Sequence, residues 1–239
     1  MDGTSEVLRQ VRAALEREPR VNLHQYPLKV NLDADGAVIV EGELANIAAK
    51  KLALEAAAAV PGVAAVIDRL RVAPATRMTD GAIRDHLRDA LCEELAFENC
   101  GISVSSRGVA QMVRRRNSLG FIEASVDNAM VTLNGQVGSF SHKCLAGALV
   151  WWVPGARDVI NGLEVVPRQD EGDNEIAEAV DLVLAKDPLV NADRMRVKTE
   201  NSVVTLEGLA ANEKESEMAE MDAWCVLGVN RVINRLEIE

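Results

Sequence analysis

The stretches VVTLEG (203–208) and GVNRVINRLEI (228–238) decide the fold, because the same pattern occurs twice more in the chain. A strand-like segment ends in glycine at AVIVEG (37–42), at MVTLNG (130–135) and at VVTLEG. A second glycine follows at one constant distance, from 42 to 62, from 135 to 155 and from 208 to 228. The residues after it match in three apolar columns, so the chain contains three copies of one unit. The columns are Val66, Val159 and Val232, then Ile67, Ile160 and Ile233, then Leu70, Leu163 and Leu236.

Each copy shows the same order of periodic segments. Apolar residues at a spacing of four predict a helix within 7–15, 83–91 and 176–184. Alternating residues then predict a strand, and turn residues at DADG (33–36), DNA (127–129) and TENS (199–202) join it to the glycine-ended strand as a hairpin. A second helix fills the gap between the two glycines, and a last strand follows. The unit is therefore helix, strand, strand, helix, strand, or αββαβ.

This order predicts an α+β fold of three tandem αββαβ domains. The hairpin strands should be antiparallel, and the strands on either side of the second helix parallel with a right-handed crossover. Each copy is then a three-stranded mixed sheet covered on one face by two helices. A unit of about 65 residues is marginal alone, so we expect the copies to pack together or the protein to oligomerise. The six repeat glycines have a structural role, with left-handed helix ends expected at the second of each pair; they are Gly42, Gly62, Gly135, Gly155, Gly208 and Gly228.

We place the domains at 1–75, 76–168 and 169–239, with about 20 extra residues inserted near 98–120 of the second. The pattern V-T-L-x-G, helix, G-V-x-x-V-x-N-x-L resembles the BON domain family, named after bacterial osmotic-stress and nodulation proteins. The resemblance covers nearly the whole chain. It implies an αββαβ fold and a module that binds phospholipid or other envelope components, often in periplasmic proteins. Copy two departs from the family pattern at Ala156, where valine is usual.

Charge and composition exclude some classes of binding partner and indicate the cellular compartment. The chain of 239 residues has a net charge of −11, and our counts for 1–77, 78–168 and 169–239 give 0, −1 and −10. An acidic last third argues against nucleic-acid binding, which needs cations to neutralise phosphates. The longest apolar stretch without charge, 144–156, is shorter than the roughly 20 residues of a membrane-spanning helix. The start, MDGTSEVLRQ, lacks the features of a secretion signal, so we expect a cytoplasmic protein.

The inserted segment carries the densest basic cluster of the chain. We interpret it as a glycine- and serine-punctuated loop, and ordered loops of this length are uncommon unless they are functional. The arginines can engage the phosphates of an anionic surface at about 1 kcal/mol per charge. Alternatively, they pair with the acidic third copy or lie in a solvated loop. The candidate binding residues are Arg107, Arg114, Arg115 and Arg116.

The second helix of copy two, HKCLAGALVWWVPGA (142–156), is apolar around most of its circumference. Either it is buried between repeats, or it forms an interface with another subunit or a membrane surface. Trp151 and Trp152 are the candidate anchors of such an interface. Trp224 shares a repeat column with Trp151, which indicates a common structural position rather than a ligand site.

The sequence contains none of the common catalytic motifs, such as a Walker loop, GxGxxG, HExxH or GxSxG. The four cysteines form no CxxC pair and the three histidines are scattered, so we expect reduced thiols, no metal site and no cofactor. We therefore predict a non-enzymatic binding module of three BON-like domains that attaches peripherally to phospholipid or another anionic surface. The alternative is a protein-interaction or self-assembly scaffold, with a protein partner or a homo-oligomer.

Overall fold

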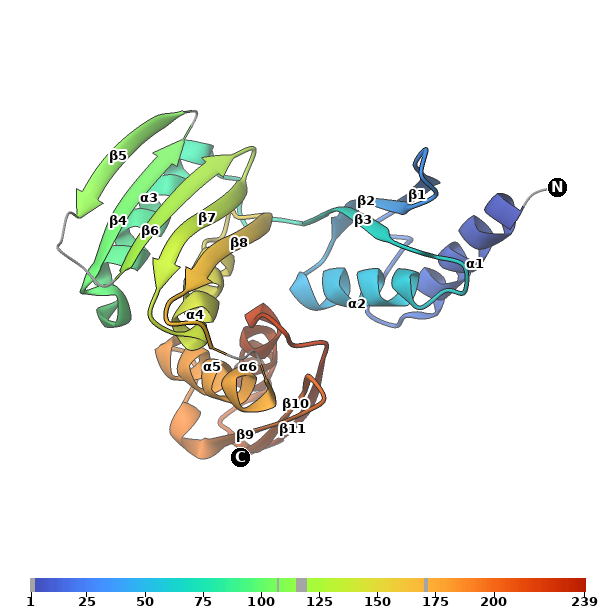
Figure 1. Cartoon of the computed structure of the whole chain (residues 1–239). Helices are drawn as coiled ribbons and strands as arrows, with labels where there is room; N and C mark the ends of the chain where they lie inside the picture. Colours follow the sequence, from blue (N-terminus) through green and yellow to red (C-terminus); the bar gives the residue numbers. More distant parts are fainter. Residues whose placement is uncertain (1–2, 107, 115–119, 170–171) are drawn as a thin grey trace. The chain divides into compact units, whose positions relative to one another are not determined.

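The computed structural model describes residues 3–106, 108–114, 120–169 and 172–239 (Figure 1). The chain divides into two compact units, Met1–Ala73 and Pro74–Glu239. The first copy of the repeat is one unit by itself, and the second and third copies share the other. The three-domain boundaries predicted above, at 75/76 and 168/169, stay a prediction within this division.

The first unit has the predicted order of elements. Helix α1 (Gly3–Arg17) precedes the antiparallel hairpin of β1 (Lys29–Leu32) and β2 (Val38–Leu44). Helix α2 (Ile47–Ala58) then leads to β3 (Val66–Val72), which pairs with β2 in parallel. Both helices cover one face of the sheet (Figure 1), as the αββαβ prediction requires. The core between them includes Leu15, Val40, Ala53 and Leu70.

The third copy repeats this arrangement. Helix α5 (Asp173–Lys186) precedes β9 (Met195–Glu200) and β10 (Val203–Ala210), which form the antiparallel hairpin. Helix α6 (Glu213–Cys225) leads to β11 (Arg231–Ile238), which is parallel to β10. The sheet order β11-β10-β9 matches β3-β2-β1 of the first copy.

The second copy differs from the prediction of three strands per sheet. After α3 (Asp80–Glu93), the inserted segment forms β4 (Cys100–Ser106) and β5 (Val109–Arg114). The expected hairpin follows as β6 (Gly120–Asp127) and β7 (Met130–Val137), and α4 (Phe140–Trp151) leads to β8 (Asp158–Val165). Strand β4 joins β6 in parallel and β5 folds back on β4, so the sheet has the order β5-β4-β6-β7-β8. The described insertion is thus mainly strand rather than loop, because Ile102 and Val104 alternate with small residues and bury one face.

An aspartate at the start of the first helix holds the hairpin turn in the second and third copies. Both carboxylate oxygens of Asp80 accept backbone N–H groups of the turn, from Asn128 at 3.1 Å and Ala129 at 2.8 Å. Asp173 does the same with Asn201 at 2.7 Å and Ser202 at 2.9 Å. These four turn residues have positive φ, which non-glycine residues rarely adopt. The aspartates therefore stabilise two turns that the local sequence alone would make costly.

The strand glycines are required by close backbone approach. At Gly135 a Cβ atom would lie 2.1 Å from the Phe121 carbonyl oxygen, and at Gly208 2.2 Å from that of Arg194. Gly62 and Gly228 have the expected left-handed conformation, with φ of +91° and +80°. Gly155 does not, so the prediction of a left-handed helix end was wrong there. Its reason is packing, because a Cβ at Gly155 would lie 2.6 Å from Cβ of Met78.

Helix α4 lies between the second sheet and the helices of the third copy. Its residues from Cys144 to Val150 are all buried, which explains why it is apolar around its circumference. It packs against β7 and β8 on one side and against α5 and α6 on the other. The structure therefore corresponds to the alternative in which this helix is buried between repeats.

Candidate functional site

Arg114 of the basic segment is an internal anchor. It is half-buried at the end of β5, and its two terminal nitrogens donate to backbone carbonyls of Phe97 at 2.7 Å and Cys92 at 2.6 Å. These bonds attach the added hairpin to the end of α3 and the short helical turn Leu95–Phe97. Both terminal nitrogens of Arg114 therefore already have partners within the chain. Arg107, Arg115 and Arg116 lie outside the described residues.

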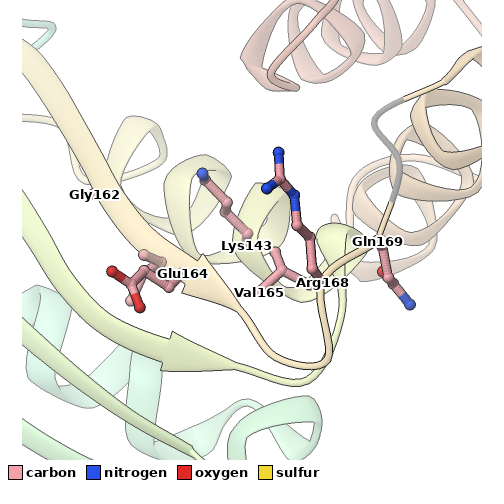
Figure 2. Close-up of a pocket in the computed structure, with 7 residues that line it drawn as sticks. Lys143, Gly162, Glu164, Val165, Arg168 and Gln169 are labelled. Atoms are coloured by element: carbon pink, nitrogen blue, oxygen red, sulfur yellow. The ribbon is translucent and has the colours of Figure 1, made fainter.

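A second group of cations lies at the opposite edge of the same sheet. Lys143 on α4 and Arg168 after β8 line a pocket of about 700 Å³, with the end of β8 as its floor (Figure 2). Figure 2 shows both side chains extending in the same direction, whereas the carboxylate of Glu164 points away from them. The rest of the lining is Gly162, Leu163, Val165 and Gln169. This pair was not predicted, because the two cations are 25 positions apart in the sequence.

Gln169 completes the pocket and caps α4. Its Oε1 accepts the backbone N–H of Phe140 at 2.8 Å, and the Ser139 hydroxyl accepts that of His142 at 3.1 Å. The first turn of α4 therefore already has acceptors for these two N–H groups. What the pocket offers a ligand is the ammonium group of Lys143 and the guanidinium group of Arg168.

Trp152 contacts the third copy. Its indole Nε1 donates to Oδ1 of Asp222 on α6 at 2.8 Å. Burial raises the pKa of Asp222 to about 8; the bond from Trp152 opposes this shift, and the neighbouring Asp187 adds to it. A second polar contact between the copies joins Lys186 of α5 to Glu94 at 2.6 Å. Trp152 thus contacts another repeat of the same chain, and its predicted role as the anchor of an interface with a subunit or a membrane stays a prediction.

The other two tryptophans belong to the same unit. Trp151 is half-buried on α4, and Trp224 is fully buried on α6. Together with Trp152 they are all the tryptophans of the chain, so tryptophan fluorescence reports on the unit Pro74–Glu239 alone. The shared repeat column of Trp151 and Trp224 is consistent with a structural position.

Cysteines and histidines are the other reactive groups of the chain. The four cysteines are free thiols, and burial raises the pKa of the Cys100 thiol. Burial also lowers the pKa of His142, whose ring meets that of Phe97 edge-on. Within the described ranges, no three His, Cys, Asp or Glu side chains gather as metal ligands would. Across those same ranges, no helix has both the length and the apolar character needed to cross a bilayer.

Comparison with known proteins identifies the repeat. The family model of the BON domain matches residues 4–74, 109–167 and 172–239. No protein of curated function matches the chain. Two solved structures of CdsD, a structural protein of the type III secretion system of Chlamydia trachomatis, are similar to it. One, its C-terminal domain, is 12% identical and covers 100% of both chains with a TM-score of 0.25. The other is 13% identical and covers 98% of this chain and 92% of its own, with a TM-score of 0.26.

Proposed function

Because the chain belongs to the BON domain family, which matches it in three segments, we propose that it is a non-enzymatic binding module. Its ligand is an anionic surface, with the phosphates of phospholipid headgroups as the groups contacted. The binding surface is on the second copy. The first copy is electrically balanced and the third carries a net charge of −10, so an anionic surface repels the third copy.

One observation supports this proposal, namely that cations from distant segments lie at the same end of the second sheet, at its two opposite edges. The strand pairings Ile102 with Arg114, Phe121 with Gln136 and Gln136 with Glu164 place the ends of β5, β7 and β8 at the same end. Lys143 follows β7 on α4, and Arg168 follows β8. We call this the basic end of the second sheet.

Two predicted residues extend the basic end in the sequence. Arg115 and Arg116 directly follow Arg114, at the point where β5 finishes. Arg107 lies between β4 and β5 in the sequence and is not part of this group. Each cation near an anionic bilayer contributes about 1 kcal/mol, so Lys143 and Arg168, together with the predicted Arg115 and Arg116, favour association. The strength should fall steeply with salt.

Vesicle flotation of the full chain tests the proposal. We expect the chain to float with vesicles containing phosphatidic acid or phosphatidylserine, and not with vesicles of phosphatidylcholine. The fraction of floated protein should decrease markedly when the salt concentration rises from roughly 20 to 150 mM, because salt screens the attraction between surface charges. The double variants Lys143→Glu with Arg168→Glu, and Arg115→Glu with Arg116→Glu, should each reduce flotation. Arg231→Glu, an exposed cation of the third copy, is the matched control. Unchanged flotation of both double variants would show that this end is not the binding surface.

The alternative is a protein-interaction or self-assembly scaffold, and the edge of the second sheet favours it. Within the described part of the chain, β5 is paired on one side only. Val109 and Met112 on this strand are 68% and 56% exposed, and an edge strand with apolar side chains is suited to pairing with another chain. We would measure the mass of the full chain and of the double variant Val109→Lys with Met112→Lys across micromolar concentrations. If both proteins have the monomeric mass, the chain does not assemble through this edge.

A further inference from the structure

The three copies share one polar contact between the second helix and the last strand. In the first copy, the ammonium group of Lys50 on α2 lies 3.0 Å from Oδ2 of Asp68 on β3. Lys50 is only 5% exposed, and it also donates to the carbonyl of Leu70 at 3.1 Å. In the first copy, the fold itself therefore provides the carboxylate that neutralises the charge of this lysine.

The third copy fills the same position without charge. Ser216 and Asn234 occupy the repeat columns of Lys50 and Asp68. The Asn234 amide donates to the Ser216 carbonyl at 3.0 Å and to its hydroxyl at 2.9 Å. The same amide also lies 3.4 Å from Oε2 of Glu220, so the third copy has an acid near this contact but no cation in it.

The second copy keeps the lysine but not the carboxylate. Lys143 occupies the column of Lys50, and Asn161 occupies that of Asp68. The Asn161 amide donates to the backbone carbonyl of Lys143 at 2.8 Å, which leaves the ammonium group out of this contact. Among the residues that the structure describes, no carboxylate pairs with Lys143 or with Arg168. The second copy therefore differs from the others by an ammonium group at a pocket where no carboxylate of the described residues pairs with it, although Glu164 also lines the pocket.

The pocket adds a second cation beside this lysine. Arg168 extends alongside Lys143 (Figure 2), and the Glu164 carboxylate points away from both. A guanidinium group presents its donors as a planar fork that matches two oxygens of a phosphate, and an ammonium group adds a compact charge. A volume of about 700 Å³ admits a phosphate group together with the small molecule or headgroup that carries it.

We propose that the pocket between α4 and the end of β8 binds a phosphate monoester through Lys143 and Arg168. The bound phosphate supplies the counter-charge that Asp68 supplies in the first copy. This inference deepens the proposed function, on which it rests for its anionic ligand, by naming the group bound and its site. The phosphate can belong to a lipid headgroup or to a dissolved metabolite, since the chemistry is the same.

The test titrates the full chain with inorganic phosphate at constant ionic strength, with chloride as the replacing ion. Amide NMR shifts are followed at residues 143, 162–166 and 168. We expect saturable shifts at these positions. Asn161→Asp, which restores the acid of the first copy beside Lys143, should weaken phosphate binding by at least about tenfold. Lys143→Gln and Arg168→Gln should each do the same.

Asn234→Asp is the matched control, because it makes the same substitution in the third copy, where Ser216 takes the place of the lysine. It loses an equivalent amide bond and should leave phosphate affinity unchanged. Tryptophan fluorescence of each variant checks that the unit is folded. Equal phosphate affinities of wild type and Asn161→Asp, both folded, would overturn the inference, as would shifts that never saturate.

Vesicle flotation distinguishes this result from failure of the proposed function. Saturable phosphate binding together with flotation on phosphatidic acid, both lost in Arg168→Gln, assigns the pocket to a lipid headgroup. Saturable phosphate binding without any flotation supports the pocket with a dissolved ligand and refutes the surface role. Flotation without phosphate binding leaves the surface role standing and refutes the pocket.

Discussion

The carboxyl group of Asp222 should make the unit Pro74–Glu239 less stable as the pH rises. The residue is 3% exposed at the junction of α4, α5 and α6, where Trp152 donates to Oδ1 at 2.8 Å. Its Oδ2 is buried, and no donor among the described residues faces it. Asp187, at the end of α5, is the acid that acts on it. A proton on Asp222 satisfies Oδ2 and can be shared with Asp187, which is why burial and this neighbour raise the pKa of Asp222 to about 8.

The size of the effect follows from the shift. The interval between the ordinary value of 3.8 and the pKa of about 8 for Asp222 corresponds to about 5 to 6 kcal/mol. Between these two values the folded protein holds a proton that the unfolded chain releases. The free energy of unfolding therefore falls by about 1.4 kcal/mol per pH unit from this group, and levels off above about pH 8.

Asp222→Asn removes this dependence while keeping the contacts. The amide oxygen accepts from Trp152, and the amide NH₂ donates where the proton was. We expect the variant to be more stable than the wild type, by a difference that grows by about 4 kcal/mol between pH 5 and pH 8. Other titratable groups are present in both proteins, so their contributions cancel in the difference between the two free energies of unfolding.

Denaturant unfolding of the full chain, followed by tryptophan fluorescence from pH 5 to 9, measures this difference. All three tryptophans lie in the second unit, so the first copy does not contribute. Trp152→Phe is the second arm, because it removes the bond that lowers the pKa of Asp222 and should move the levelling point to higher pH. A difference between wild type and Asp222→Asn that is constant over this range would refute the reasoning.

Three further predictions concern contacts within single copies. Asp80→Ala removes both acceptors of the 128–129 turn and should cost about 1 to 3 kcal/mol in denaturant unfolding followed by fluorescence. Gly135→Ala places a Cβ 2.1 Å from a carbonyl oxygen and should cost more than about 2 kcal/mol, whereas Gly138→Ala, with no atom within 4 Å, should be tolerated in the same assay. Asp68→Asn leaves the buried Lys50 without its carboxylate and should cost about 2 to 3 kcal/mol, measured by far-ultraviolet circular dichroism; an unchanged midpoint would contradict the role of this ion pair.

Because the chain is a repeat, the order of helices and strands that the three copies share could be predicted from the sequence. The column of Gly42, Gly135 and Gly208 recurs because each strand approaches a neighbour's backbone or side chain too closely for a Cβ atom. The need for a residue without a Cβ atom concerns one position in each copy, so the sequence shows it as a glycine that recurs. The order of helices and strands follows from periods of about four and two residues, which are local as well.

The inserted strands were not predictable in the same way. Cys100–Ser106 pairs in parallel with Gly120–Asp127, and nothing in either segment specifies a parallel partner across the intervening hairpin. The alternation of Ile102 and Val104 was present, but glycine and serine between them are also typical of loops. Strand pairing is a tertiary property, and the local composition indicated a loop.

The orientation of the basic side chains was the other missing information. Three consecutive arginines predict an exposed cluster, yet Arg114 turns toward the carbonyls at the end of α3. The pocket cations could have been found from the repeat columns. Lys50 with Asp68, Lys143 with Asn161 and Ser216 with Asn234 are aligned in the sequence, and the second pair alone combines a cation with a neutral residue.

Comparison of the three copies therefore indicates which residues serve ligand binding rather than folding. The copies share one fold, so contacts that are satisfied in all three describe what the fold needs. A lysine that is paired in the first copy and absent from the third is not needed by the fold in the second. Two cations that line one pocket, with no carboxylate partner among the described residues, favour an anion bound between them. The pocket of Lys143 and Arg168 is thus a place where ligand binding, rather than folding, accounts for the residues present.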